Sequence, residues 1–347
     1  METTLLNEGG YMELRDIVFE LLAAPGITGA EDDAAATASR LLSRYMPVRR
    51  DTLGSVIGEM QGDGTGVLLD AHLDQIGLFV TAVTDEGFVK VSKCGGADIR
   101  TMACHEVRIL GKQPVYGVVV STPPHLRKDE DAVPKWEDLA IDVGLSAQQA
   151  RACIAPGDRV QLLGKAREML HGRISAAALD DRAGIAAILR AIEILNEKNV
   201  QTKLTVVFSV QEETSGGGAC AAAFQSDAET AIAVDVSFAG APGLSSVETK
   251  PMGEGTLIGL SPSLTRSVSD TLQTLAQKNK VPYNLEPMSG STGTNAEQYA
   301  FSKCGKKTGL LSIPIRNMHT GVEVCDLRDI EATAQLLALY VEQGGQV

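Results

Sequence analysis

Apolar residues recur every three or four positions in several stretches of the chain, which predicts amphipathic helices. The N-terminal example covers residues 11–24 and ends at Pro25-Gly26, a pair that stops a helix. A second helix is predicted at residues 34–45, followed by strands at 55–60 and 66–72 with a glycine-rich turn between them. The apolar stripe of the first helix consists of Leu14, Ile17, Val18, Leu21 and Leu22.

Between residues 77 and 164 the pattern changes to short valine-rich segments separated by glycine and proline. Such segments predict a small β barrel or sandwich. The predicted strands are 78–83, 88–92, 106–110, 115–121 and 159–162. A long irregular stretch, residues 123–137, is charged and expected to be exposed.

After His171 the chain alternates between strands and helices. This alternation predicts an α/β domain with a mixed central sheet flanked by helices on both faces. The predicted strands are 204–210, 231–236, 283–286 and 309–315, and the predicted helices are 182–197, 218–225, 267–278, 295–301 and 329–342. The β module therefore reads as an insertion, residues 76–165, that splits an α/β domain made of residues 1–75 and 166–347.

Composition indicates a globular chain without a nucleic-acid or membrane partner. The 347 residues are 44% hydrophobic, enough for one large or two medium domains. A net charge of -13 disfavours binding to nucleic acids and acidic membranes. We expect no secretory signal, because the first residues contain neither a basic nor an apolar segment of the kind that such signals have, and no apolar run approaches the ~20 residues of a membrane span. We expect a cytoplasmic protein.

The six cysteines are scattered and form no Cys-x-x-Cys pair. This spacing favours reduced, mostly buried thiols over disulfides or metal ligands. They are Cys94, Cys104, Cys153, Cys220, Cys304 and Cys325.

Two adjacent carboxylates, Glu212 and Glu213, follow the predicted strand 204–210 and precede a glycine-rich turn. Neighbouring carboxylates without local cations are costly unless a cation lies between them or one of them keeps a proton. We expect a metal ion as that cation, with one glutamate as a ligand and the other as a general base.

Metal-type side chains occur in four further segments. Four of the five segments lie at or near the carboxyl end of a predicted strand, where sites form in open α/β sheets, and the fifth enters a helix. The five segments are 70–74, 179–182, 211–213, 234–236 and 318–320.

Each segment has an alternative structural interpretation. A lone histidine such as His72 is more often structural than a ligand, and an aspartate that starts a helix, such as Asp180, is more often an N-cap. Asp235 in an apolar strand needs a charged or hydrogen-bonding partner, because a buried carboxylate is costly. Together the segments indicate a divalent-ion site of the zinc or cobalt type. Three histidines lack such a context: His105, His125 and His171.

A pair of ions that share one carboxylate and one water accounts for all these residue types. Each ion also needs an imidazole and a further carboxylate. Asp74 lies two residues after His72 and is placed to orient its imidazole. Glu212 is left to take a proton from the metal-bound water. The predicted ligands are His72, Asp180, Glu213, Asp235 and His319.

With these motifs the chain resembles the tetrahedral (TET) aminopeptidases, also called glutamyl or deblocking aminopeptidases and sometimes labelled cellulases. The matching segments run in family order over nearly the whole chain. They are residues 25–31, 71–77, 178–184, 211–213, 233–236, 293–296 and 313–320.

The resemblance implies that Asp180 bridges two divalent ions, Zn²⁺ or Co²⁺, that Glu212 is the general base and that Asp74 supports His72. The terminal ligands that it implies are His72, Glu213, Asp235 and His319. It also implies a zinc-peptidase-like catalytic domain, an inserted small β-barrel or PDZ-like domain used in dimerisation, and assembly of six dimers into a hollow tetrahedral dodecamer.

Three residues depart from the usual family pattern: Gln75, Asn295 and Thr320 stand where many members have Glu, Asp and Ser. None is a predicted ligand, so the departures bear on substrate preference and on the surroundings of the ligands. Residues 257–264 and 290–295 are expected to form walls of the specificity pocket.

The expected function is hydrolytic removal of N-terminal residues from peptides. The free amine would contact one metal, and a metal-bridging water deprotonated by Glu212 would attack the carbonyl. The alternative is a related metal-dependent amidohydrolase, a deacylase or carboxypeptidase, that anchors a carboxylate instead. A non-catalytic binding or assembly protein is disfavoured by the complete ligand set. A cellulase finds little support, because aromatic residues are only 4% of the chain.

Overall fold

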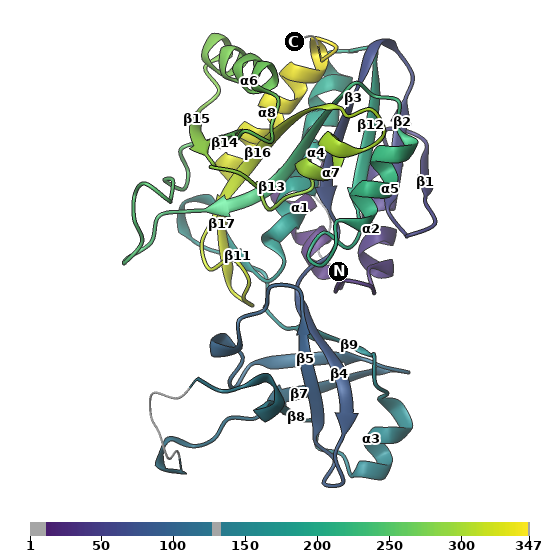
Figure 1. Cartoon of the computed structure of the whole chain (residues 1–347), viewed down its shortest axis with the longest axis vertical. Helices are drawn as coiled ribbons and strands as arrows, with labels where there is room; N and C mark the ends of the chain where they lie inside the picture. Colours follow the sequence, from purple (N-terminus) through teal and green to yellow (C-terminus); the bar gives the residue numbers. More distant parts are fainter. Residues whose placement is uncertain (1–11, 127–132, 346–347) are drawn as a thin grey trace.

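The computed structural model describes residues 12–126 and 133–345. It consists of an α/β domain and a β barrel, which Figure 1 shows above and below a narrow connection. The chain leaves the α/β domain after β3 (Asp63–His72), forms the barrel from β4 (Gly77–Val83) to β9 (Arg159–Leu162), and returns. The predicted α/β fold with an inserted small β module is confirmed.

The α/β domain is built on an eight-stranded mixed sheet within the described residues, in the order β1-β2-β12-β3-β13-β16-β14-β15. Its four central strands run parallel, while β1, β2 and the contact between β14 and β16 are antiparallel. The strands besides β3 are β1 (Val48–Arg50), β2 (Val56–Met60), β12 (Thr202–Ser209), β13 (Thr230–Phe238), β14 (Thr256–Leu260), β15 (Tyr283–Pro287) and β16 (Lys307–Ile315).

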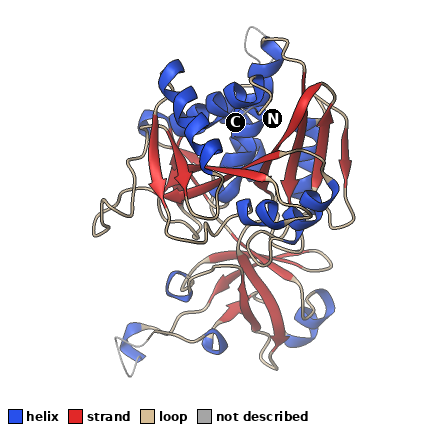
Figure 2. Cartoon of the chain, turned by 45° about the horizontal axis from the view of Figure 1, so that its top comes forward, coloured by secondary structure: helices blue, strands red, loops and turns tan. Residues whose placement is uncertain are grey.

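Helices cover both faces of this sheet, as Figure 2 shows. One face packs against α1 (Leu14–Ala23), α2 (Asp32–Leu42), α4 (Leu179–Glu197), α6 (Arg266–Asn279) and α8 (Leu327–Glu342) in the largest apolar core. The other face packs against α5 (Gly217–Gln225) and α7 (Ala296–Phe301). None of the helices in the described part of the chain combines the length and hydrophobicity that a membrane span needs.

Side-chain alternation along the central strands decides which residues each face receives. Val67, Leu69 and Ala71 of β3 enter the core under α4 and α8, whereas Leu68 packs under α5 and α7. Because the period of a strand is two, Asp70 and His72 point to the same face as Leu68. Polar side chains therefore gather at the α5/α7 face, where β3 ends.

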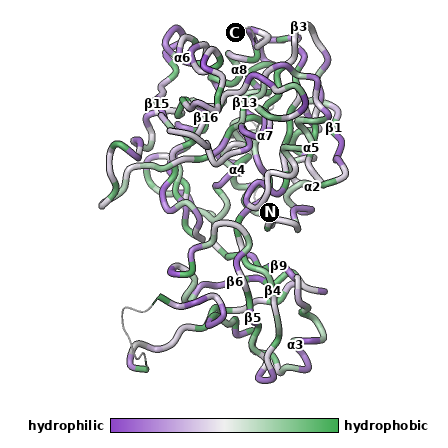
Figure 3. The backbone as a smooth tube through the Cα atoms, viewed as in Figure 1, coloured by the Kyte–Doolittle hydropathy of each residue, from purple (hydrophilic) through white to green (hydrophobic). Residues whose placement is uncertain are grey.

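The inserted module is a closed antiparallel barrel, in the order β4-β5-β8-β7-β6-β9 within the described residues. It has its own apolar core, separate from that of the α/β domain. In Figure 3 hydrophobic positions run along the barrel strands, and hydrophilic positions lie at the outer turns. The remaining barrel elements are β5 (Val89–Cys94), β6 (Glu106–Leu110), β7 (Pro114–Val119), β8 (Ala140–Asp142) and α3 (Ala147–Cys153).

Several elements were not predicted. Besides β1, β8, β14 and α3, these are the strands of a small sheet beside the large one: β10 (Arg167–Glu168), β11 (Arg173–Ala176) and β17 (Glu323–Asp326). The strands of this small sheet are too short or too mixed in composition for a period-two pattern. Within the sheet β10 pairs with the nearby β11, and β11 pairs with the distant β17. The predicted N-terminal helix begins at Leu14, and its residue Tyr11 lies outside the described residues.

Two further expectations need correction or qualification. All six cysteines are free, but only Cys94 and Cys325 are buried, so the prediction of mostly buried thiols is wrong. A small side chain tolerates exposed turns and helix faces, where Cys104, Cys220 and Cys304 lie. The irregular stretch 123–137 contains short 3₁₀ turns, and Leu126 within it is exposed, but residues 127–132 lie outside the described part.

Candidate active site

The predicted site residues converge at the carboxyl edge of the central strands. His72 ends β3, Asp235 lies near the end of β13, and Glu213 follows β12 in a turn. Asp180 lies in the first turn of α4, and His319 lies in the loop after β16. Neighbouring parallel strands carry their polar ends to the same edge, which explains why residues far apart in sequence meet here.

Asp180 joins the two imidazoles. Its Oδ1 lies 3.0 Å from Nε2 of His72, and its Oδ2 lies 3.0 Å from Nε2 of His319. The φ and ψ angles of Asp180 and Asp181 are not helical, and the peptide bond between them is cis. The backbone N–H of Asp180 donates to Glu323 Oε2 at 3.2 Å. Each carboxylate oxygen of Asp180 thus faces a different histidine.

Two groups of potential ligand atoms share Asp180. In one group Asp235 Oδ1 lies 3.9 Å from His72 Nε2, and in the other Glu213 Oε1 lies 3.4 Å from His319 Nε2. Within each group the three ligand atoms lie within 4.8 Å of one another. The arrangement suits two cations with Asp180 between them.

Burial and crowding make this cluster electrostatically unstable on its own. Burial raises the pKa of Glu212 to about 7 and that of Asp235 well above its ordinary value. Burial opposes charge on the imidazoles too, but hydrogen bonds to Asp180 raise the pKa of His319 to about 11 and that of His72 well above its ordinary value. No lysine or arginine lies within 4.0 Å of these carboxylates among the described residues.

These observations fit divalent cations. Without metal, each imidazole Nε2 can carry a proton and donate it in a hydrogen bond to a carboxylate. Once that proton is released, the same Nε2 and the carboxylate can bind one cation together. Glu213 Oε1 is buried and accepts no hydrogen bond of good geometry from the described residues, which leaves it free for a cation. Histidine nitrogens together with carboxylate oxygens match the preferences of Zn²⁺ and related ions.

Asp74 makes different contacts from those expected. His72 Nδ1 lies 2.9 Å from the backbone oxygen of Asp74 and 3.6 Å from its carboxylate, so the carbonyl makes the closer contact with the ring. The Asp74 carboxylate accepts hydrogen bonds from the backbone N–H groups of Glu212 and Glu213, at 2.9 and 3.1 Å, and from Thr28 Oγ1 at 2.7 Å. It therefore holds the turn that carries both glutamates.

Several buried polar residues around the site were not singled out from the sequence. Asp181 and Glu323 are fully enclosed near Asp180, and burial raises the pKa of both carboxyls well above their ordinary values. Asn295, noted only as a departure from the family pattern, donates to Asp70 Oδ2 at 2.8 Å and to Ser209 Oγ at 2.9 Å. Only Asp181, as the neighbour of Asp180, carried a sequence signal.

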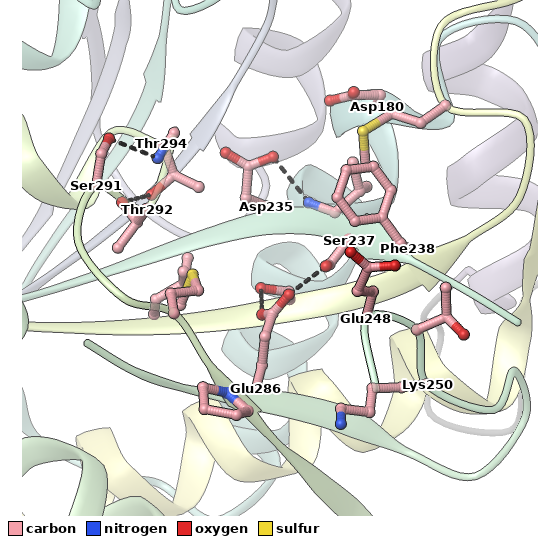
Figure 4. A pocket seen from close by; sticks show the side chains of 18 of the residues that line it. Asp180, Asp235, Ser237, Phe238, Glu248, Lys250, Glu286, Ser291, Thr292 and Thr294 are labelled. Atoms are coloured by element: carbon pink, nitrogen blue, oxygen red, sulfur yellow. Dashed lines mark hydrogen bonds between the residues drawn. The ribbon is translucent and has the colours of Figure 1, made fainter. Parts of the chain in front are cut away.

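A pocket of about 860 Å³ opens from the cluster, and Figure 4 shows its side chains. Residues 236–238, 244 and 247–250 line one part of it, and residues 286–289 and 291–294 line another. The expectation that the loop 290–295 forms a wall is confirmed for residues 291–294. It is wrong for residues 257–264, because that segment begins as the buried strand β14 and does not line the pocket.

The remaining histidines do not belong to the ligand groups found among the described residues. His105 is partly buried beside the barrel strands, and burial lowers the pKa of its ring. His125 and His171 are exposed. Their exclusion from the site agrees with the sequence analysis.

The mixed sheet carries imidazoles and carboxylates clustered at its carboxyl edge, an arrangement that fits a metal centre in an α/β fold. Residues 54–336 match the family described as M42 glutamyl aminopeptidase, and the chain belongs to this family of metal-dependent peptidases. It is therefore a peptidase. The resemblance to the TET aminopeptidases is confirmed.

Individual relatives agree over nearly the whole chain. The sequence is 31% identical to the lysyl aminopeptidase of Pyrococcus furiosus over 338 residues, which cover 94% of this chain and 96% of the relative. Aminopeptidase APDkam598 from Desulfurococcus kamchatkensis superposes with a TM-score of 0.89 at 30% identity, covering 95% of this chain and 94% of that one. The Pyrococcus horikoshii TET1 peptidase, which can assemble into a tetrahedron or a large octahedral shell, gives 0.84 at 29% identity, covering 94% and 98%.

Proposed function

We propose that this protein is a dinuclear metal-dependent aminopeptidase that removes N-terminal residues from peptides. The observation that carries the proposal is the position of Asp180, whose two oxygens each lie 3.0 Å from a different imidazole. A single carboxylate between two imidazoles, each with a further carboxylate nearby, is the donor set that a pair of divalent ions requires.

The proposed ligands divide into two sets that share Asp180. His72 and Asp235 would complete one set, and His319 and Glu213 the other. Zn²⁺ or Co²⁺ suits these donors. When bound, such ions would polarise the scissile carbonyl and make a water nucleophilic at neutral pH.

Glu212 is the proposed general base. It lines the pocket, belongs to neither ligand group, and has its backbone N–H held by Asp74. Its carboxylate would take the proton of the attacking water and give it to the nitrogen of the leaving amine. Burial raises the pKa of Glu212 to about 7, which favours both halves of this transfer near neutral pH.

The charges of the pocket favour a substrate with a free amine over one with a free carboxylate. In the described part of the chain six carboxylates line the pocket, and the basic side chains that line it are those of Lys250 and His319. A carboxypeptidase anchors the substrate carboxylate with a positive group, typically a bidentate arginine, and no arginine is found in this lining.

The test uses metal-depleted protein that is reloaded with Zn²⁺, Co²⁺ or Mn²⁺. Three substrates are compared: a peptide with a free N-terminus, the same peptide with an acetylated N-terminus, and an N-acetylated amino acid. We expect metal-dependent release of the first residue from the free peptide only. Equal cleavage of the acetylated peptide, or preference for the N-acetylated amino acid, would instead support the deacylase alternative.

We also propose that residues 76–165 form the inserted barrel domain and that this domain serves in dimerisation. The TET1 peptidase of Pyrococcus horikoshii, similar over 94% of this chain, can assemble into a tetrahedron, so a dodecamer of six dimers is the expected form here. Light scattering coupled to size-exclusion chromatography measures the mass directly, and a monomeric mass would contradict both the proposed dimer and the proposed dodecamer.

A further inference from the structure

One carboxylate of the pocket, that of Glu286, has no part in the proposed metal centre. It projects from the edge strand β15 across the sheet and accepts hydrogen bonds from two serine hydroxyls. One comes from Ser237 on β13, and the other comes from Ser312 on β16 at 2.8 Å. Figure 4 shows Glu286 reaching toward Ser237, below Asp235.

The register of the sheet places this carboxylate beside the metal centre. Asp235 and Ser312 are paired residues of parallel neighbours, so their side chains share a face, and Ser237 follows on the same face two residues later. Paired residues are about 4.8 Å apart and residues two apart are about 7 Å apart. A substrate residue whose backbone lies at Asp235 could therefore reach the Glu286 carboxylate with a long side chain.

Within residues 12–126 and 133–345, Glu286 has no cationic partner. No lysine or arginine nitrogen lies within 4.0 Å of its carboxylate among the described residues, although Lys250 also lines the pocket. Glu286 is half-buried, so its charge is only partly screened by water. The two hydroxyls each occupy one lone pair of the carboxylate and leave others directed to the pocket.

Apolar side chains surround the route to this carboxylate. Met288 packs against a small apolar cluster that contains Leu310, and both residues line the pocket together with Phe238. An aliphatic stem that ends in a cation matches such a path, because its methylene groups pack on apolar surface while its charged end reaches a polar group. Lysine and arginine are the residues with this shape.

We propose that Glu286 selects peptides whose N-terminal residue is lysine or arginine, by binding the side-chain cation at the far end of the pocket. The proposal rests on the aminopeptidase function proposed above. Glu286 would act on the side chain of the substrate and not on the reacting atoms, so it is a specificity-determining residue.

The test compares kcat/KM for aminoacyl p-nitroanilides of lysine, arginine, norleucine and glutamate with metal-loaded protein. Norleucine keeps the lysine stem and lacks its ammonium group. We expect lysine and arginine to exceed norleucine by about 10- to 100-fold, the usual effect of a charge-assisted hydrogen bond. We expect Glu286→Gln to remove most of this advantage while the norleucine rate changes less than about threefold.

Two matched variants locate the effect. Glu254→Gln removes an exposed carboxylate that does not line the pocket and should leave every ratio unchanged. Glu248→Gln removes the other carboxylate of the pocket that lies outside the metal centre, and loss of the lysine preference there and not in Glu286→Gln would overturn the assignment.

Other outcomes also overturn the inference. A wild-type preference for glutamate or norleucine contradicts it, and this ratio does not depend on whether a variant folds. An equal loss on all four substrates in Glu286→Gln would indicate that Glu286 only ties β15 to the sheet. If the metal-loaded protein cleaves no free-amine substrate, the proposed function fails, whereas cleavage without a cationic preference contradicts this inference alone.

Discussion

The carboxylate of Asp74 accepts a hydrogen bond from the backbone N–H of Glu212. Asp74 Oδ1 accepts the Glu212 N–H at 2.9 Å, and Oδ2 accepts that of Glu213 at 3.1 Å. Asp74 is fully buried, and its own backbone oxygen contacts His72 Nδ1 at 2.9 Å. One residue therefore holds both the proposed general base and a proposed ligand.

The first prediction concerns this link. Asp74→Asn should lower kcat by about 10- to 100-fold, because one of the two accepting oxygens becomes an NH₂ group that cannot accept a backbone N–H, and the turn with both glutamates loses one of its two hydrogen bonds. The measurement is kcat and metal content side by side. Thr28→Val is the matched control, since it removes one hydrogen bond to Asp74 but leaves the carboxylate in place. A normal kcat in Asp74→Asn would contradict the role.

The second prediction tests the general base. Glu212→Gln should keep its metal and lose about 10²- to 10⁴-fold in kcat, because the amide cannot take the proton of the attacking water. Elemental analysis gives the metal content, and a free-amine peptide gives the rate. Glu229→Gln, an exposed glutamate far from the pocket lining, should behave as the wild type. Near-normal turnover in Glu212→Gln would rule out this assignment.

The third prediction tests the bridging residue. Asp180→Ala should lose most of its bound metal, because both ligand groups depend on this carboxylate. Elemental analysis after dialysis measures the occupancy. Asp33→Ala, an exposed aspartate in the first turn of α2, should retain wild-type occupancy. Full occupancy in Asp180→Ala would count against the bridge.

The fourth prediction concerns metal and stability. Metal-depleted protein should melt at a lower temperature than reloaded protein, because cations relieve the repulsion among buried carboxylates and bind only the folded chain. Metal at a hundred times its Kd contributes about 2.7 kcal/mol, a shift of several degrees in a concentration-dependent Tm. Asp180→Ala should show little of this shift. Equal melting temperatures with and without metal in the wild type would contradict the metal centre.

The fifth prediction concerns pH and Asp329, in the first turn of α8. Its carboxyl accepts the N–H groups of Gly253 and Gly255 at 2.6 and 2.8 Å, and burial raises its pKa from 3.8 to about 6. The folded state therefore binds the proton more tightly than the unfolded state. The contribution of protonated Asp329 to the free energy of unfolding is fully present below about pH 4, and it is lost as the pH rises through about 6.

Asp329→Asn lacks this titration. The difference in Tm between wild type and Asp329→Asn should therefore shift in favour of the variant between pH 4.5 and 7.5, by an amount equivalent to a few kcal/mol. Thermal melts of both proteins at several pH values measure it, and metal effects cancel in the difference. A difference that does not change with pH, or that moves the other way, would contradict the raised pKa.

The elements that the sequence predicted are those with a strong local pattern. The strands at 66–72, 231–236 and 309–315 are short, mainly apolar runs, and the helix at 182–197 repeats its apolar positions over four turns. The strand β17 was missed because Glu323–Asp326 mixes charged and apolar residues. It forms by pairing with Arg173–Ala176, about 150 residues away, which no local pattern reports.

The sequence by itself determined which chemical groups the site contains and the α/β scaffold that carries them, because strand and helix periodicities are local. Only the tertiary structure decided which groups meet. Asp180 stands 108 residues from His72 and 139 from His319, yet contacts both. The hydrogen bonds of Asp74 to the glutamate turn, and those of Glu286 to two strands, likewise depend on how strands are ordered in the sheet. Periodicity specifies which face of an element is buried, but only packing against the rest of the chain specifies its neighbour.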